Sequence, residues 1–434
     1  MQPETDPFPE SLAVTGGAPN QSSLHRRLPL TTLLIANAVS LSGEAVTAVA
    51  IPWYVYTTTG SAAQMGLVGF FTVLPRVLAT FFGGALVDRI GFRRTSVTAD
   101  MLSGLAIAGI PLLSGAGLLS FPTLLALVFL GAVFDGPGAT ARESMAPELA
   151  AHAGVPLARV NAIYQTVQRL ALLIGPALAG VLIVAFGATR VLWIDAVTFA
   201  VSALLVGVGT QGVALPGPPP EQRPYWQDLT TGLRAIMADP LLRALAVVLC
   251  FLNFVEAPLV AVALPVLVRE RFGSAETFGV LVSALGAGAV VGSLVYAAIG
   301  PRYSRYRVFS LAYLAVGLPY WVLAATPSVV IAIGAMVAMG LAAAPLNPIL
   351  MTVRQERVTE TARARVFGTM TAVAFVAIPL GQLVGGLVIE SAGVTTAFML
   401  MGALFLITTL AIRLLPVLRQ MDATPSFGPA SEAR

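Results

Sequence analysis

The chain has 434 residues, of which 57% are hydrophobic and only 11% are charged, and its formal net charge is +4. A water-soluble domain carries about 25% charged residues, so this composition excludes a soluble globule and predicts an all-α polytopic membrane protein. All the basic residues are arginine. A phosphate-binding loop with its lysine is therefore absent, and ATP-driven pumping by this chain is not expected.

Residues 1–28 contain proline, serine and acidic residues but no apolar core, which predicts a disordered cytoplasmic tail and no cleavable signal peptide. A bilayer crossing needs about 20 apolar residues. Twelve segments of this kind follow: 30–56, 64–87, 94–116, 121–141, 158–185, 190–209, 242–267, 276–299, 306–325, 327–351, 364–389 and 394–415. They predict a six-helix bundle at 29–209, a cytoplasmic linker at 210–241, a second six-helix bundle at 242–416 and a cytoplasmic tail at 417–434.

The linker is rich in proline and glycine from Gly212 to Pro224. After it, Leu229, Leu233 and Ile236 recur at helical spacing among charged residues. This pattern predicts a short amphipathic helix on the inner membrane surface.

The two halves of the chain repeat each other. Features of the first half return 213 positions later, with Pro52, Gly60, Gly66, Arg89 and Arg94 recurring as Pro265, Gly273, Gly279, Arg302 and Arg307. Near the end of each half the offset is 206, with Arg159, Gly180 and Gly187 recurring as Arg365, Gly386 and Gly393. The repeat predicts two helix bundles in the same orientation around a central site, an arrangement typical of transporters.

The arginines predict the orientation of this bundle pair. With twelve spans and an internal N-terminus, twenty arginines fall on the inner side, three on the outer side, and Arg76 and Arg169 lie within spans. Cytoplasmic loops carry an excess of positive charge, so we expect both termini in the cytoplasm.

A short polar loop follows the second span, from Gly84 to Arg94. Gly84 would let a neighbouring helix approach closely, and Gly91 would let the backbone reverse in a tight turn. Asp88 is placed to meet helix N-termini and arginines at the inner surface.

This loop resembles the signature loop of the major facilitator superfamily, G-x-x-x-D-R-x-G-R-R, with Phe92 where the family often has a basic residue. The resemblance implies the fold of that superfamily. It also implies that Asp88 holds the inner side against the opposite half, with Arg89 and Arg93 as its partners. The second copy has Pro301 in place of the aspartate, so we expect an asymmetric latch.

Span five contains Gly175 and Pro176 in a run of small residues that ends at Gly180. A proline removes a helix hydrogen bond and small residues permit close packing, so an ordinary kinked helix is one interpretation. The run also resembles the gating Gly-Pro motif of drug–proton antiporters, although Ala179 replaces the usual second glycine. Three longer segments resemble the macrolide-efflux and siderophore-export branch: 40–66, 157–195 and 363–393.

Seven charged residues are predicted inside the spans: Glu44, Arg76, Asp100, Asp135, Arg169, Asp195 and Glu256. Each costs about 2.5–3.5 kcal/mol at the bilayer centre, so we expect them to form ion pairs, to face a water-filled cavity or to act in function. Asp100 is expected to pair with an arginine of the inner surface. Arg76 and Arg169 are either counter-charges for Glu44 or ligands for an anion.

Glu44 and Glu256 are the main candidates for proton coupling, because they lie mid-span at nearly equivalent places in the repeat. The first and seventh helices are expected to line the central cavity. A carboxyl removed from water is protonated more readily, so each could exchange a proton. Asp135 and Asp195 are further candidates for this role.

Substrate binding is expected to involve Glu44, Glu256, the two mid-span arginines and four neighbouring side chains: Gln165, Phe251, Asn253 and Phe254. Gln165 belongs to a polar stripe beside Arg169 that either faces the cavity or joins helices. The aromatic residues and Asn253 surround Glu256 on span seven.

Together these features predict a proton-coupled transporter that exports lipophilic cationic or neutral molecules by alternating access. We expect no enzymatic activity, cofactor, metal site or nucleic-acid partner, and a monomer in a bacterial cytoplasmic membrane. Three alternatives are open: export of an anionic metabolite such as a siderophore, proton-coupled uptake, and a non-transporting membrane sensor or scaffold.

Overall fold

The computed structural model describes residues 21–213, 225–358 and 360–423. The side chains of residues 21–25, 80–89, 225–229, 360, 361 and 364 lie outside that description, as do the expected tails before residue 21 and after residue 423 and most of the expected proline-rich linker. Every regular element in the described ranges is a helix. Twelve spans among them are long and apolar enough to cross a membrane, which confirms the predicted number.

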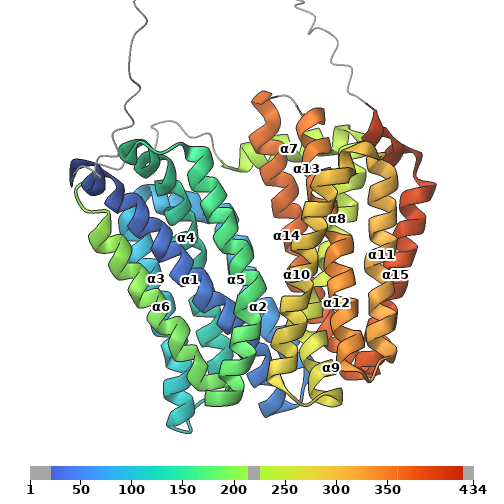
Figure 1. Cartoon of the computed structure of the whole chain (residues 1–434), viewed down its shortest axis with the longest axis horizontal. Helices are drawn as coiled ribbons and strands as arrows, with labels where there is room; N and C mark the ends of the chain where they lie inside the picture. Colours follow the sequence, from blue (N-terminus) through green and yellow to red (C-terminus); the bar gives the residue numbers. More distant parts are fainter. Residues whose placement is uncertain (1–20, 214–224, 359, 424–434) are drawn as a thin grey trace, which may run out of the picture.

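The helices form two bundles (Figure 1). The first contains α1 (Gln21–Thr59), α2 (Ala62–Ile90), α3 (Phe92–Gly115), α4 (Phe121–Ala153), α5 (Leu157–Phe186) and α6 (Ala188–Gly209). After α7 (Tyr225–Ala238), the second contains α8 (Pro240–Pro258), the π-helix η1 (Leu259–Ala263), α9 (Leu264–Arg271), α10 (Ala275–Ile299), the 3-10 turn η2 (Gly300–Arg302), α11 (Arg305–Ala325), α12 (Val329–Ala343), α13 (Leu346–Arg357), α14 (Glu360–Ala392), α15 (Val394–Leu414) and the 3-10 turn η3 (Pro416–Asp422).

Backbone geometry repeats between the bundles. Gly60 and Gly273 are 213 positions apart and have φ angles of 67° and 75°. Gly187 and Gly393 are 206 positions apart and have φ angles of 84° and 82°. Each of these glycines lies in the short connection between two spans, where a positive φ favours glycine. The repeated sequence therefore builds repeated turns.

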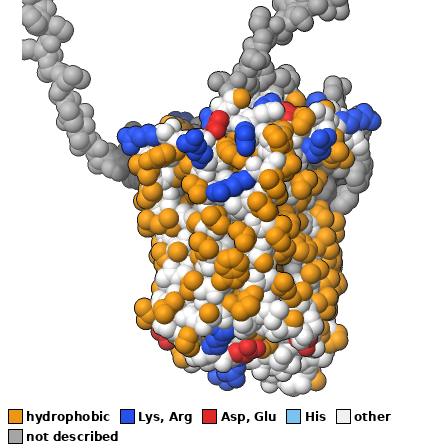
Figure 2. Space-filling model, turned by 90° about the vertical axis from the view of Figure 1, so that its right-hand side faces the viewer, with side chains coloured by type: hydrophobic (Ala, Val, Ile, Leu, Met, Phe, Trp, Pro, Cys, Tyr) orange, Lys and Arg blue, Asp and Glu red, His pale blue; other side chains and the backbone are white. Residues whose placement is uncertain are grey.

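The outer surface of the bundles is apolar around its middle. Leu105, Val197 and Ile407 lie near the middle of α3, α6 and α15 and are exposed by 67%, 57% and 60%, which a water-soluble protein would avoid over so wide an area. Figure 2 shows this band on one face, with arginines gathered at the end that carries α7 and fewer charges at the other end. We call these the α7 end and the α9 end.

The two bundles touch along two seams, one between α2 and α14 and the other between α5 and α10. A Cβ added at Gly386 would lie 2.9 Å from the Cα of Gly66, so the α2 and α14 backbones are in direct contact. Gly279 of α10 packs equally closely on the carbonyl oxygen of Pro176. Because Gly66 and Gly279 are repeat partners, the two seams are related by the internal symmetry. Both lie toward the α9 end, and the bundles diverge toward the α7 end (Figure 1).

The helix expected after the linker is present as α7, and it contacts α8 and α14. Ile236 is buried, whereas Leu233 and Met237 are exposed. Gly232 is required at the contact, because a Cβ there would overlap Thr369 of α14. The helix is thus docked on the second bundle, against α8 and α14.

Candidate functional site

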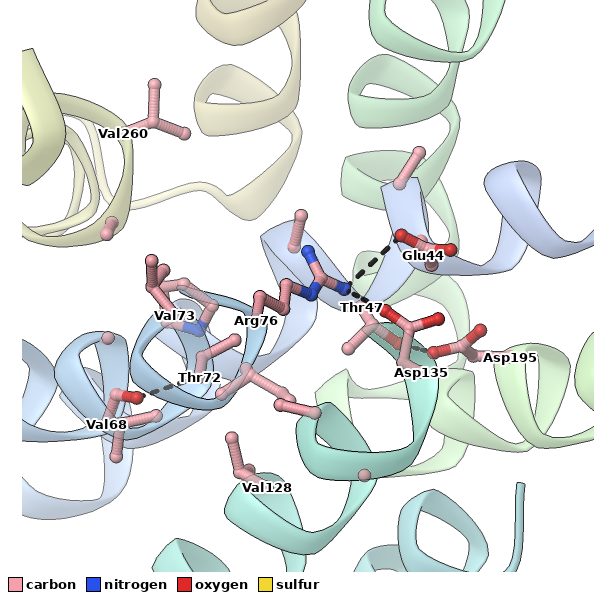
Figure 3. A pocket seen from close by; sticks show the side chains of 18 of the residues that line it. Glu44, Thr47, Val68, Thr72, Val73, Arg76, Val128, Asp135, Asp195 and Val260 are labelled. Carbon is pink, nitrogen blue, oxygen red and sulfur yellow. Dashed lines mark hydrogen bonds and ion pairs between the residues drawn. The ribbon is translucent and has the colours of Figure 1, made fainter. Parts of the chain in front are cut away.

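A cavity of about 440 Å³ lies between the bundles. Most of its wall comes from α1, α2 and α4, and most of the lining side chains are apolar. The second bundle contributes Ala257, Val260, Ala261 and Gln382. Figure 3 shows Val260 facing the cluster of charged side chains from across the cavity. Such a mostly apolar chamber with a few polar groups is typical of a small-molecule site.

Arg76 of α2 is the centre of the charged cluster (Figure 3). Its Nη2 donates to Asp135 Oδ2 at 2.7 Å and to Glu44 Oε2 at 3.3 Å. The Arg76 side chain is 45% exposed, the Glu44 side chain 23% and the Asp135 side chain 8%. One guanidinium nitrogen thus donates hydrogen bonds to two carboxylates on two helices. Of the two acids, Glu44 has the longer contact with Arg76 and the more exposed side chain.

Small residues bring the helices close enough for these contacts. A Cβ added at Gly136 of α4 would lie 2.8 Å from the Cβ of Ala79 on α2. A Cβ at Gly175 of α5 would lie 2.5 Å from the Cβ of Ala45, next to Glu44. Glycines at such crossings let membrane helices approach closely, and here they set the distance between α4 and α2 and the distance between α5 and α1.

Asp195 of α6 is the third carboxyl of the cavity wall. It accepts hydrogen bonds from the hydroxyls of Thr47 and Thr198 and has no described ion pair. Gly43 leaves the space for this contact, because a Cβ there would overlap Thr198 and Asp195. Asp135 Oδ1 is buried without a hydrogen-bond partner among the described residues. The described part of the lining therefore holds three carboxyls and a single guanidinium.

A second buried network lies beside the cavity. Arg142 Nη1 donates to Asp100 Oδ1 at 2.5 Å, and Ser202 donates to Asp100 Oδ2 at 2.6 Å. Arg142 also reaches Ser40 at 3.3 Å, so the network joins α1, α3, α4 and α6. The expected pairing of Asp100 with an arginine is confirmed. The fourth span was predicted to end at residue 141, but α4 continues to Ala153, so Arg142 is a helix residue and the sequence analysis missed its role. Its position seven residues after Asp135, two turns along the same helix face, was the available signal.

Glu256 does not line this cavity, although Ala257 beside it does. Glu256 is half-buried on α8 and forms no ion pair with a described residue. The structure therefore separates Glu256 from Glu44, which the sequence analysis placed in one chamber. Asn253 donates to the carbonyl oxygen of Ala374 at 3.0 Å and so joins α8 to α14.

The other predicted binding residues also lie apart from the cavity lining. Phe251 and Phe254 are half-buried on α8. Gln165 and Arg169 are exposed on α5, and Arg169 forms no ion pair with a described residue, so it is not a counter-charge for Glu44. Gln168 of the same polar stripe does line the cavity.

Predicted gating residues fall into two groups. Pro176 lies at the α5–α10 seam, where the amide of Ala177 donates to Ser283 at 3.0 Å, whereas Gly175 packs on Ala45 of α1. Gly91 has a φ of 90° and precedes α3, as expected for a backbone reversal, and Arg93 is half-buried beside it. The remaining latch residues have side chains outside the described part of the chain, so their role stays a prediction: Gly84, Asp88 and Arg89.

Comparison with known proteins gives three kinds of match. A family model described as "Transmembrane secretion effector" matches residues 22–430. The multidrug efflux pump Tap of Mycobacterium tuberculosis is 34% identical over 403 residues, covering 92% of this chain and 96% of the pump. The enterobactin exporter EntS of Escherichia coli is 26% identical over 426 residues, covering 95% of this chain and 98% of the exporter.

Solved structures match the fold. The nucleoside transporter NupG superposes with a TM-score of 0.73 at 13% identity, covering 89% of this chain and 98% of that protein. A bacterial homolog of the human lysosomal transporter Spinster, in an inward-facing and unoccupied conformation, superposes with a TM-score of 0.65 at 16% identity, covering 92% and 98%. At these identities the likeness shows a common architecture of two six-helix bundles.

Proposed function

The chain belongs to the transmembrane secretion effector family of the major facilitator superfamily, and we propose that it is a proton-coupled exporter of lipophilic cationic or neutral small molecules. It is a multi-pass membrane transporter and not an enzyme. The similarity to the Tap multidrug efflux pumps supports export as the direction of transport.

The main observation in support of this proposal is that the apolar cavity contains more carboxyl groups than guanidinium groups. Among the side chains that the structure describes, Glu44, Asp135 and Asp195 share the wall with one guanidinium, that of Arg76. The apolar lining suits a lipophilic body, and unbalanced carboxylates away from bulk water attract a cation. A cavity of about 440 Å³ has room for a molecule of drug size.

Proton coupling is proposed for Glu44. Its contact with Arg76 is 3.3 Å long, whereas that of Asp135 is 2.7 Å, and its side chain is the more exposed of the two. Glu44 is therefore the acid that most easily exchanges Arg76 for a proton or for a substrate cation. Because one carboxylate cannot hold both, a proton that binds Glu44 expels the cation, and proton entry drives substrate exit.

Alternating access is proposed to run between the two ends of the molecule. The glycine seams hold the halves together near the α9 end and the bundles diverge toward the α7 end, so we propose that the cavity is reached from the α7 end in this conformation. Arginines gather at the α7 end, which by the positive-inside rule faces the cytoplasm. Substrate would enter from the cytoplasm of a bacterial cell, and opening of the seams would release it outside.

Proteoliposomes that contain the purified chain test the coupling. An imposed proton gradient should drive tetraphenylphosphonium against its own gradient, and E44Q should lower that flux at least tenfold while leaving the protein folded. E143Q is the matched control, because Glu143 is an exposed acid of α4 that does not line the cavity. Unchanged proton-driven flux in E44Q would remove Glu44 from the mechanism.

Export of an anion is the second candidate function. Arg76 is 45% exposed toward the cavity, and the chain is similar to the enterobactin exporter. Arg76 is, however, already shared by two carboxylates, which favours a cation. Tetraphenylphosphonium and tetraphenylborate have nearly the same shape and opposite charge. Binding of the borate alone would favour the anion exporter, and binding of the phosphonium alone would favour the cation exporter.

A further inference from the structure

Gln382 of α14 is a polar side chain that the second bundle places in the cavity wall, beside alanines and a valine. It is only 8% exposed, and its amide oxygen is buried without a hydrogen-bond partner among the described residues. Buried polar atoms almost always have a partner, and each exception needs an explanation. A buried, unpaired amide at the edge of a ligand-sized cavity indicates that a ligand completes its hydrogen bonding.

The position of this amide depends on the α2–α14 seam. A Cβ added at Gly69 would lie 2.7 Å from Gln382 Oε1, so the absence of a side chain on α2 makes room for the amide. One turn earlier on α2, a Cβ at Gly66 would lie 2.5 Å from the backbone carbonyl oxygen of Gln382. The amide thus lies against α2 of the first bundle only while α14 rests on α2.

We propose that Gln382 is the substrate contact supplied by the second bundle, and that it hydrogen-bonds an N–H group of a lipophilic cation whose charge is held by Glu44 and Asp135. The inference rests on the proposed function. It adds the substrate group that is recognised, an N–H donor, and the residue that recognises it, Gln382. A terminal amide accepts hydrogen bonds through its oxygen and donates through its nitrogen, so the oxygen suits an ammonium or aromatic amine.

This contact also gives the site different affinities for the substrate when the α2–α14 seam is closed and when it is open. When the seam opens, α14 leaves α2 and carries Gln382 away from the carboxylates of the first bundle. A cation that was held from both sides then keeps only its contacts with the first bundle. Substrates that carry N–H donors therefore bind tightly from the α7 end and are released when the α9 end opens.

Two probe cations separate the hydrogen bond from the charge. Ethidium carries aromatic amine N–H groups, and tetraphenylphosphonium carries none. The purified chain is titrated with each, and the dissociation constants are compared with those of Q382M, which keeps the length of the side chain. We expect Q382M to weaken ethidium binding about fivefold and to change tetraphenylphosphonium binding less than twofold.

Q64M is the matched control, because Gln64 also has a buried amide oxygen without a described partner but does not line the cavity. It should leave both dissociation constants unchanged. If Q382M does not fold, G69A takes its place, since a methyl group there displaces the amide, and it should weaken ethidium selectively.

Two outcomes of the Q382M titrations contradict the inference. Equal weakening of both cations would make Gln382 a packing residue, and unchanged ethidium binding would remove it from the site. Binding of tetraphenylphosphonium by the unaltered chain supports the proposed function whatever the ethidium result. Failure of the unaltered chain to bind either cation would overturn the proposed function, and this inference with it.

Discussion

Glu390 of α14 caps the first turn of α2 from the opposite bundle, with its Oε2 accepting the backbone N–H of Ala62 at 2.7 Å. The N–H of Ala63 lies 3.3 Å from the same oxygen. The first amides of a helix have no partner within the helix, and a carboxylate there is favoured by the helix dipole. The contact spans 328 residues of sequence and ties the two halves together at the α9 end.

Removing this cap should loosen the α9 end. We expect E390A to raise the population that is open there about fivefold, because loss of a cap costs ~1 kcal/mol. The readout is the labelling rate, by a membrane-impermeant maleimide added from outside, of a cysteine at Ile51 on the cavity wall, with Cys250 changed to alanine. E276Q is the control, since Glu276 is an exposed acid at the first turn of α10 that caps no helix of the other half. Equal labelling of E390A and E276Q would contradict the prediction.

The α2–α14 seam should not tolerate a single added methyl group. A Cβ at Gly386 would lie 2.6 Å from the Ala62 carbonyl oxygen, whereas a Cβ at Gly368 of the same helix meets nothing within 4 Å. We expect G386A to lower transport at least tenfold by holding the seam apart, and G368A to leave transport within twofold of the unaltered chain. Comparable transport by the two variants would show that the seam does not need direct backbone contact.

Buried Asp100 and Arg142 should stabilise the first bundle as a pair. Their side chains are 0% and 2% exposed, and removing one partner leaves an uncompensated buried charge, at a cost of about 3–5 kcal/mol. We expect R142Q to lower the thermal unfolding midpoint in detergent markedly. The double variant D100N/R142Q should recover much of the loss, because both charges are gone. A double variant less stable than R142Q would argue against the ion pair as the source of stability.

The two mid-span arginines should differ in function. Arg76 holds two cavity carboxylates, whereas Arg169 is exposed and lies apart from the cavity lining. R76Q leaves two facing carboxyls without a counter-charge, so we expect proton-driven transport to fall at least tenfold. R169Q should change transport less than twofold. Loss of transport in R169Q would place the working site on α5, outside the cavity described above.

Properties that follow from local chemistry could be predicted from the sequence. Twelve spans follow from the length of apolar segments, and the duplicated bundle follows from glycines at fixed offsets, such as Gly60 and Gly273. Charged residues in a membrane span must be compensated, so the pairing of Asp100 with an arginine was predictable as a type of contact. The partner itself, Arg142, was not.

Only the tertiary structure decided which side chains share a cavity. Successive residues of a helix point about 100° apart, and helices that are apolar nearly all round give little sign of which face turns inward. Rotation and packing therefore determined that Arg76 meets Glu44 and Asp135, that Glu256 lies outside the cavity lining, and that Gln382 reaches the wall from the opposite bundle. The sequence by itself determined which charged residues the membrane spans contain, and the packing of α1, α2 and α4 decided which of them lie together.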